Sequence, residues 1–311
     1  MTASVLVTPR SLSEAGLDAV PELAPLRDRG LELVSGPAGR SPNEAELLGL
    51  VPGVVGWLAG VERISSRVIE AANDLRVISR NGSGTDAVDI DAAERAGVLV
   101  ERATGANAQG VAELALALAL AALRDIPSGA AALREGRWKR VIGLELAECT
   151  VGVVGLGAVG RRVVEAFAGF GAHVVAFDPF VVQADVELVD LDRLIAASDV
   201  VTLHCPPTAD GSPMMDRARI AAMRSGAVLV NTARSALVDD TAVLAALEAG
   251  RLSAYAIDAF DSEPPEPSAL LAHPRVIATP HLGGYTRASV QRATAQAVAN
   301  LLRVLDETPS R

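Results

Sequence analysis

Residues 150–167 read TVGVVGLGAVGRRVVEAF. A short apolar run leads into three glycines, Gly155, Gly157 and Gly160, and a helical pattern follows them. Glycines at such a junction allow a tight turn and let the backbone approach a pyrophosphate, which the positive end of the helix attracts. A glycine pattern by itself also fits a tight turn that binds nothing. Its place between a strand and a helix predicts the dinucleotide-binding loop of a Rossmann-type domain.

An acidic residue at the end of the next apolar run supports this prediction. The run AHVVAF (172–177) is followed by Asp178, which lies 21 residues after Gly157 (178 − 157). The acid that binds the ribose hydroxyls of a dinucleotide is expected about 20 residues after the glycines. A carboxylate there repels a 2′-phosphate, and the following DPF stretch contains no arginine, so we expect NAD and not NADP.

Outward from this loop, short β-like runs alternate with helical patterns along the whole chain. The expected strands before residue 101 are SVLVT, LELVS, VVGWL, LRVIS and GVLVE, and those after it are TVGVVG, AHVVAFD, DVVTLH, GAVLVN, LSAYAID and RVIATP. Strands that are continuously apolar are typical of parallel sheets buried on both faces. Two blocks of alternating strands and helices therefore predict an α/β protein with two doubly wound parallel-sheet domains.

Composition narrows the class of protein further. Half of the 311 residues are hydrophobic and only 3% are aromatic, which fits a globular core of Ala, Val, Leu and Ile. The formal charge of −10 disfavours nucleic acid as a partner, because phosphates would repel the chain. Cys149 and Cys205 have no metal-ligand spacing, which predicts no metal site and a reduced, cytoplasmic setting. The apolar run at 111–123 is too short to cross a bilayer, and no signal peptide is apparent.

Three polar residues follow the last three expected strands. Arg234 comes after GAVLVN, Glu263 after LSAYAIDAF and His281 after RVIATP. Ligands of open α/β sheets bind at the carboxyl ends of the strands. A neutral His281 would accept the hydroxyl proton during hydride transfer to NAD, Glu263 would hold the imidazole, and Arg234 would pair with a substrate carboxylate. Each residue alone also fits a surface ion pair, a solvated loop or a turn, so their combination carries the prediction.

The other histidines are weaker candidates. His173 opens the second strand of the nucleotide-binding block, and His273 precedes a strand, at the end of the sheet away from the ligand. His204 follows DVVTL and is expected to line the adenine side of the cofactor.

At this point the chain resembles a known family, the D-isomer-specific 2-hydroxyacid dehydrogenases, and within it the phosphoglycerate dehydrogenase-like branch. The motifs that carry the resemblance are RNGSGTDAVDIDAAERAGV (80–98), GANAQGVAELALALALAALRDI (105–126), VGVVGLGAVG (151–160), LHCPPT (203–208), NTARSALVDD (231–240), AIDAFDSEPP (256–265) and TPHLGGYT (279–286). The resemblance covers nearly the whole chain, and these motifs follow one another in the family's order.

The resemblance implies roles for individual residues. Arg234, Glu263 and His281 take the catalytic positions. The substrate contacts fall on Arg80, Asn81, Gly82, Ser83 and Gly84, with Arg234 and His281, and the amides of residues 81–84 would bind the substrate carboxylate. The cofactor contacts fall on Ser83, Gly155, Gly157, Ala158, Val159, Gly160, Asp178, His204, Cys205, Pro206, Thr232, Ala233, Asp258, His281, Gly283 and Gly284.

The resemblance also implies an NAD-binding Rossmann domain, residues 101–283, inserted in a flavodoxin-like substrate domain, residues 1–100 and 284–311. It further implies a homodimer, with a cleft that closes on the substrate. The chain departs from the family at Ser235, where a glycine usually follows the catalytic arginine, and a left-handed backbone would be strained at a serine. It ends at Arg311 without the regulatory domain of longer phosphoglycerate dehydrogenases, so serine feedback is not expected.

The substrate and even the class of activity leave alternatives open. The expected activity is that of a D-3-phosphoglycerate dehydrogenase-like enzyme, in which Arg80 would receive a phosphate, although a salt bridge at a strand end fits this arginine equally well. Hydroxypyruvate, glyoxylate or a larger 2-keto acid suits the same chemistry, and phosphite oxidation is another alternative. Formate is disfavoured because related formate dehydrogenases have Gln where Glu263 stands. An NAD-sensing corepressor-like scaffold with little turnover is the alternative of another class.

Overall fold

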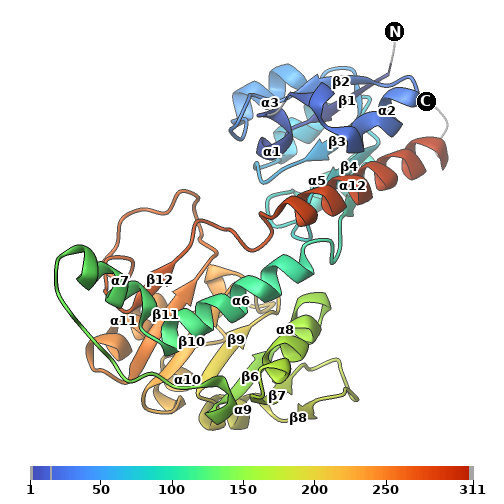
Figure 1. Cartoon of the computed structure of the whole chain (residues 1–311). Helices are drawn as coiled ribbons and strands as arrows, with labels where there is room; N and C mark the ends of the chain where they lie inside the picture. The colour runs from blue at the N-terminus through green and yellow to red at the C-terminus, as the bar shows by residue number, and fades with distance from the viewer. Residues whose placement is uncertain (1–2, 15, 308–311) are drawn as a thin grey trace. The chain divides into compact units, whose positions relative to one another are not determined.

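The computed structural model describes residues 3–14 and 16–307 (Figure 1). The chain divides into two compact units. Unit 1 contains the residues up to Asn107 together with those from Thr286 on, and unit 2 runs from Ala108 to Tyr285. The N-terminal segment and the C-terminal helix thus belong to one unit, and the middle of the chain forms the other.

Unit 1 is built on a parallel five-stranded sheet of order β2-β1-β3-β4-β5 among the described residues. Its strands are β1 (Ser4–Val7), β2 (Glu32–Ser35), β3 (Val54–Ala59), β4 (Val77–Arg80) and β5 (Leu99–Arg102). Its α-helices are α1 (Arg10–Ser13), α2 (Ala24–Asp28), α3 (Glu44–Leu50), α4 (Ser66–Ala71), α5 (Ile90–Ala96) and α12 (Arg287–Glu307). This strand order is that of flavodoxin-like folds, as the family resemblance implied.

The two faces of this sheet bury separate cores because alternate strand residues point to opposite sides. Leu6 of β1 and Trp57 of β3 lie in the core beneath α3, α4 and α5. Val5 and Val7 lie in the core on the other face, which α12 covers with residues such as Leu301. The strands therefore carry apolar residues at consecutive positions, which explains why they read as continuous apolar runs.

Unit 2 is built on a parallel seven-stranded sheet of order β12-β11-β10-β9-β6-β7-β8 in the described part of the chain. Its strands are β6 (Thr150–Val154), β7 (His173–Phe177), β8 (Glu187–Leu188), β9 (Val200–Leu203), β10 (Ala227–Asn231), β11 (Leu252–Ile257) and β12 (Val276–Ala278). Its α-helices are α6 (Ala108–Leu123), α7 (Ile126–Arg134), α8 (Ala158–Gly169), α9 (Leu191–Ala197), α10 (Arg217–Ala222) and α11 (Asp240–Glu248). Counted from β6, the order is the Rossmann order with one further strand.

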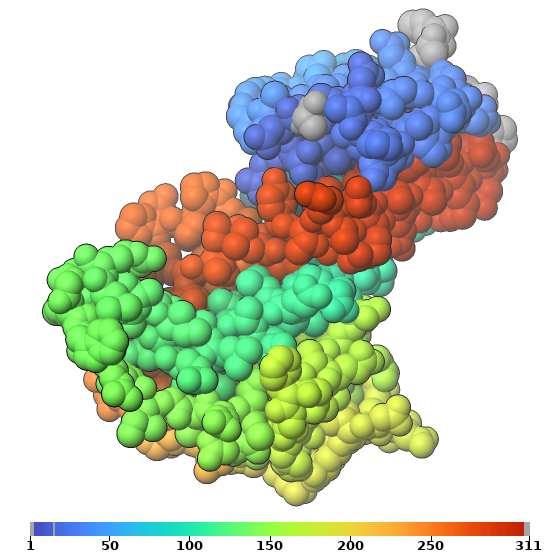
Figure 2. Space-filling view, viewed as in Figure 1, coloured from blue at the N-terminus to red at the C-terminus, as the bar shows by residue number. Residues whose placement is uncertain are grey.

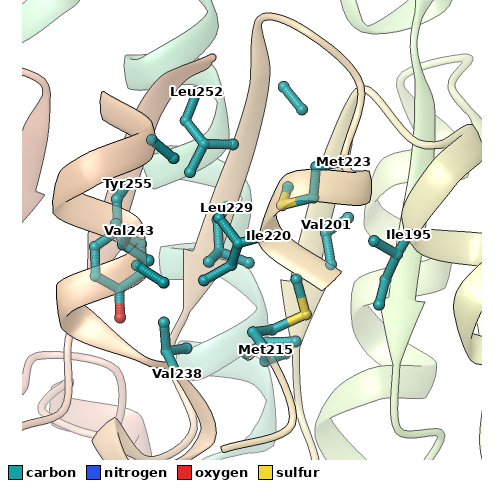
Figure 3. Packing of buried hydrophobic residues seen from close by; sticks show 14 of the residues in the cluster. Ile195, Val201, Met215, Ile220, Met223, Leu229, Val238, Val243, Leu252 and Tyr255 are labelled. Atoms are coloured by element: carbon teal, nitrogen blue, oxygen red, sulfur yellow. The ribbon is translucent and has the colours of Figure 1, made fainter. Parts of the chain in front are cut away.

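This sheet too is covered on both faces. Val228 and Val230 of β10 pack in the core under α6 and α8. The intervening Leu229 packs on the opposite face with residues of α9, α10 and α11, and Figure 3 shows it there beside Ile220 and Val243. The predicted fold class is confirmed. All eleven expected strands form, and among the strands of the described residues the sequence analysis missed only the two-residue β8.

In the described residues no single helix is long and apolar enough to cross a membrane. Within that part of the chain α6 and α7 taken together reach that length and composition, and a bend of 62° separates them.

Candidate active site

The glycine loop joins β6 to α8 at the place where the strand order reverses, between β6 and β9. Gly155 has φ +95°, and a Cβ there would lie 2.6 Å from the carbonyl oxygen of His204. A Cβ on Gly160 would lie 1.8 Å from the carbonyl oxygen of Gly155, which no side chain can accept. These two positions therefore require glycine, one for its left-handed backbone and both for close packing.

Gly157 differs, because a Cβ there would meet nothing within 4 Å. It is the N-cap of α8, and no side chain caps this helix end. The backbone N–H groups of the first turn, from Ala158 and Val159 on, thus face an open approach at the positive end of the helix. This arrangement fits the pyrophosphate of a dinucleotide.

Asp178 lies at the end of β7, beside the same loop. Its Oδ2 accepts a hydrogen bond from the N–H of Leu156 at 2.8 Å, and its Oδ1 accepts one from the N–H of Phe180 at 2.9 Å. Each carboxylate oxygen can accept a second hydrogen bond. The two backbone contacts fix the carboxylate next to the glycine loop and leave it able to receive ribose hydroxyls.

Across the switch point, His204 and Cys205 follow β9. The Nε2 atom of His204 lies 2.8 Å from Oγ1 of Thr202, and its enclosed Nδ1 has no partner in the described protein. The side chain keeps some accessible surface, but burial lowers the pKa of His204 to about 3, so the ring is neutral at physiological pH. Burial likewise raises the pKa of the Cys205 thiol to about 11, which keeps the thiol protonated. Neither residue is suited to be a base or a nucleophile.

The loop after β10 carries Thr232, Ala233 and Arg234, and the buried Asn231 holds it. Asn231 Nδ2 donates to the carbonyl of Arg234 at 2.8 Å, and its Oδ1 accepts from the N–H of Ala233 at 3.0 Å. Arg234 Nη1 donates to the carbonyl of Ala233 at 2.8 Å. The enclosed Oγ1 of Thr232 has no partner among the described residues, so a bound molecule would supply one. Sequence reasoning missed Asn231, whose signal was a lone amide ending an apolar strand.

Glu263 and His281 are in direct contact. The distance between His281 Nδ1 and Glu263 Oε1 is 2.5 Å, with 45% of the imidazole side chain and 29% of the carboxylate side chain exposed. An ionised carboxylate only accepts hydrogen bonds, so this contact assigns the proton to Nδ1. The Nε2 atom of a neutral His281 then carries a lone pair that can accept a proton.

The loop of His281 is held by the buried Asp258. Its Oδ1 accepts from the Thr279 hydroxyl at 2.6 Å and from the N–H of Leu282 at 2.7 Å, and its Oδ2 accepts from the N–H of Gly283 at 2.8 Å. Between these contacts His281 has φ 53°, which a non-glycine residue rarely adopts. Such backbone strain persists only where the surroundings impose it, and it concentrates at functional sites.

The three sequence-predicted catalytic residues all belong to unit 2 and follow three adjacent strands, β10, β11 and β12. Glu263 touches His281, and the loop of Arg234 touches the loop of Glu263 through a hydrogen bond from Ser235 Oγ to Asp261 Oδ1. Ser235 has no left-handed backbone that would be strained at a serine, because Asp125 and His281 are the described non-glycine residues with positive φ. The carboxyl edge of this sheet thus carries a cation, an acid and an imidazole.

Residues 80–84 belong to unit 1. The buried Arg80 donates from Nε to the carbonyl of Gly84 at 3.0 Å, and Ser83 Oγ donates to the carbonyl of Ala103 at 3.3 Å. Asn81 Oδ1 lies 3.4 Å from the hydroxyl of Thr294. These contacts fix the loop from within unit 1, and one guanidinium donor of Arg80 is used in a hydrogen bond to the loop itself.

Comparison with known proteins shows which family the chain resembles. Residues 116–283 match the model of the D-isomer specific 2-hydroxyacid dehydrogenase, NAD binding domain. The chain is 41% identical over 260 residues to D-3-phosphoglycerate dehydrogenase of Mycobacterium bovis (strain ATCC BAA-935 / AF2122/97), covering 81% of this chain and 49% of the relative. It is 35% identical over 268 residues to hydroxypyruvate reductase of Thermotoga maritima, covering 84% of this chain and 88% of the relative.

Among solved structures, the TT0316 protein from Thermus thermophilus matches with a TM-score of 0.89 at 37% identity, over 99% of this chain and 98% of that one. A glyoxylate reductase from Paecilomyes thermophila matches with a TM-score of 0.86 at 26% identity, over 98% and 96% of the two chains. The chain spans about half the length of several of its curated relatives. It belongs to the D-isomer specific 2-hydroxyacid dehydrogenase family, and unit 2 contains the family's NAD binding domain.

Proposed function

We propose that the protein is an NAD-dependent dehydrogenase that interconverts a D-2-hydroxy acid and the corresponding 2-keto acid. The observation that carries this proposal is the contact between His281 and Glu263 at the carboxyl edge of a sheet with an open dinucleotide loop. NAD, when bound, supplies the hydride acceptor. The chain's own residues then have to bind the acid, orient it and move one proton.

The proton is assigned to His281. In the oxidising direction its Nε2 accepts the proton of the substrate hydroxyl, and Glu263 stabilises the imidazolium that forms. In the reducing direction the imidazolium returns the proton to the carbonyl oxygen. Because the side chain of Glu263 binds Nδ1, the imidazole stays in the tautomer that this exchange requires.

Arg234 is the proposed partner of the substrate carboxylate. Its planar guanidinium can donate two parallel hydrogen bonds to a carboxylate, and its charge polarises the adjacent carbonyl group. The amides of residues 81–84 in unit 1 are proposed from the family pattern as an anion-binding element, as a nest of N–H groups suits an anion.

The residues around the glycine loop are proposed to hold the cofactor. The open helix end at Gly157 fits the pyrophosphate, Asp178 fits the ribose hydroxyls, and the unpartnered Thr232 hydroxyl fits a hydrogen-bonding group of the dinucleotide. The further contacts proposed from the family pattern are Ser83, Pro206, Ala233, Gly283 and Gly284.

For the substrate, we propose 3-phosphohydroxypyruvate or hydroxypyruvate. The similarity to phosphoglycerate dehydrogenases, about half of whose length this chain covers, supports 3-phosphohydroxypyruvate. The similarity to a hydroxypyruvate reductase, covered over 88% of its length, supports hydroxypyruvate. Arg80 is buried and donates a hydrogen bond to the carbonyl of Gly84, which weakens its assignment as the residue that binds the phosphate. Both substrates are 2-keto acids and need the same proton transfer.

The test is NADH oxidation by the purified protein with a panel of 3-phosphohydroxypyruvate, hydroxypyruvate, glyoxylate and pyruvate, together with NAD reduction by phosphite. We expect turnover with at least one keto acid. His281→Ala should then lower kcat by about 10²–10⁴-fold while NADH binding persists, because general acid–base catalysis contributes that much. NADH binding without turnover of any acid would instead indicate a sensing scaffold, and phosphite-dependent activity would redirect the substrate assignment.

We also propose a homodimer through the surface of α7 and the segment that follows it, which lies on the surface of unit 2 in green in Figure 2. Large apolar side chains are exposed there: Ile126, Leu133, Trp138, Val141, Ile142 and Leu144. Contiguous exposed apolar patches mark interaction sites.

Sedimentation or light scattering of wild type and Ile142→Glu tests the dimer. We expect a dimer that the variant shifts to monomer, and a monomeric wild type would exclude it.

The predicted cytoplasmic location rests on two cysteines, Cys149 and Cys205, both free thiols in the structure.

A further inference from the structure

A hydrogen bond connects the two loops that carry the proposed catalytic groups. Ser235, directly after Arg234, donates from Oγ to Oδ1 of Asp261, which lies two residues before Glu263. A residue without a side-chain donor at this position would leave Asp261 without this hydrogen bond.

Backbone hydrogen bonds within its own loop hold Ser235 in position. It begins a short 3₁₀ turn, in which Leu237 N–H donates to the Arg234 carbonyl at 3.2 Å and Val238 N–H donates to the Ser235 carbonyl at 3.0 Å. Asn231 binds the same Arg234 carbonyl at 2.8 Å from the strand below. With its backbone fixed in this way, Ser235 can hold a partner in a definite position.

Asp261 lies in an acidic environment, which makes a neutral donor useful. The carboxylate of Asp240 is close enough that Asp261 contributes to raising the pKa of Asp240, after burial as the larger cause. A carboxylate near another carboxylate is stabilised by hydrogen bonds to its oxygens. The Ser235 hydroxyl supplies one such bond and thereby fixes the loop that ends in Glu263.

We propose that the Ser235–Asp261 hydrogen bond is a positioning contact that sets the spacing between Arg234 and the Glu263–His281 pair. The inference rests on the proposed function, in which one substrate must meet the guanidinium and the imidazole together. Small displacements of groups that clamp a substrate lower the rate strongly. Ser235 and Asp261 act through their neighbours and touch no reacting atom.

The test uses the full chain with Ser235→Ala, Asp261→Ala and the double variant. Ser235→Thr and Asp261→Asn keep a hydroxyl donor and an acceptor oxygen, and Ser262→Ala is the matched control in the same loop, since the Ser262 hydroxyl makes no hydrogen bond in the described residues. Four quantities are measured: the KM and the kcat for hydroxypyruvate, the Kd of NADH, and the Kd with which the enzyme–NADH complex binds oxamate, an unreactive keto acid analogue. Hydrogen–deuterium exchange of peptides covering residues 232–238 and 259–265 reports on the loops without turnover.

Each alanine variant should raise the KM for hydroxypyruvate and the oxamate Kd by about fivefold, as the loss of one hydrogen bond predicts. The double variant should be no worse than the single variants, because both remove the same contact. In the alanine variants hydrogen–deuterium exchange should rise in both peptides, while the affinity for NADH should stay near wild type. Ser235→Thr, Asp261→Asn and Ser262→Ala should resemble wild type in kinetics, binding and exchange.

Two results would overturn the inference: unchanged exchange of 259–265 in Ser235→Ala, or single effects that multiply in the double variant. If the wild type neither binds oxamate nor oxidises NADH with any keto acid, the proposed function fails. Exchange then still decides the loop contact, which stands if Ser235→Ala loosens both peptides and falls if it does not.

Discussion

Replacing Asp258 with asparagine tests how the protein holds its proposed catalytic histidine. Asp258 is 2% exposed and accepts three hydrogen bonds, from Thr279, Leu282 and Gly283. These three residues flank His281 in the sequence. Asparagine has nearly the same shape but only one acceptor oxygen. Its amide oxygen can keep the bonds to Thr279 and Leu282, so its NH₂ group then faces the N–H of Gly283.

The loss of stability follows from these contacts. A hydrogen bond to a charged group contributes about 1.5–3 kcal/mol and a neutral one about 0.5–1.5 kcal/mol. One charge-assisted bond disappears and two become neutral, which gives a loss of about 3.5–6 kcal/mol in the free energy of unfolding. For a domain the size of unit 2 this corresponds to a fall in Tm of about 7–24 °C. The released loop should also relax the left-handed backbone of His281, so kcat should fall by about tenfold or more, as expected for a misplaced catalytic group.

Differential scanning calorimetry measures the Tm, and NADH oxidation with a keto acid substrate measures kcat. Asp185→Asn is the control, because it removes one exposed carboxylate outside the loop. An Asp258→Asn variant with the same Tm as Asp185→Asn and the kcat of wild type would contradict this role of Asp258. A variant that lost only NADH affinity would assign Asp258 to the cofactor and not to the histidine loop.

Three further predictions concern single side chains. Arg234→Lys should raise the KM for the keto acid and lower kcat, because an ammonium cannot form the planar fork, and steady-state kinetics that leave the KM unchanged would contradict this. Wild type should prefer NADH over NADPH in kcat/KM, and Asp178→Ala should reduce that preference; a wild-type preference for NADPH would refute the assignment. His204 has a pKa of about 3 in the folded protein against 6.5 ordinarily, so the unfolded chain binds the extra proton between these values and stability is lost as pH falls from about 6.5 towards 3. Urea unfolding at pH 7 and pH 5 should therefore show a larger fall in the free energy of unfolding for wild type than for His204→Gln. Equal falls would exclude a contribution of His204 to the pH dependence of stability.

Much of the fold could be read from local properties of the chain. Apolar runs bounded by helical patterns located the strands because strands covered on both faces need apolar residues at consecutive positions. The glycine loop could be recognised because Gly155 needs a left-handed backbone and Gly160 a missing Cβ, and both requirements select one residue type. Chain direction alone placed Arg234, Glu263 and His281 at one edge of a parallel sheet.

The contacts that hold those residues were decided by the tertiary structure. Asp258 binds residues 21 to 25 positions later, Ser235 binds a residue 26 positions away, and Asn231 clamps its loop from a strand end. Nothing in the local sequence distinguishes such a side chain from a solvated one, because its partner is brought close only when neighbouring strands align. The sequence thus determined which groups are available for the chemistry, and the packing of β10, β11 and β12 determined how they are held, since a hydrogen bond depends on distances that only the folded chain defines.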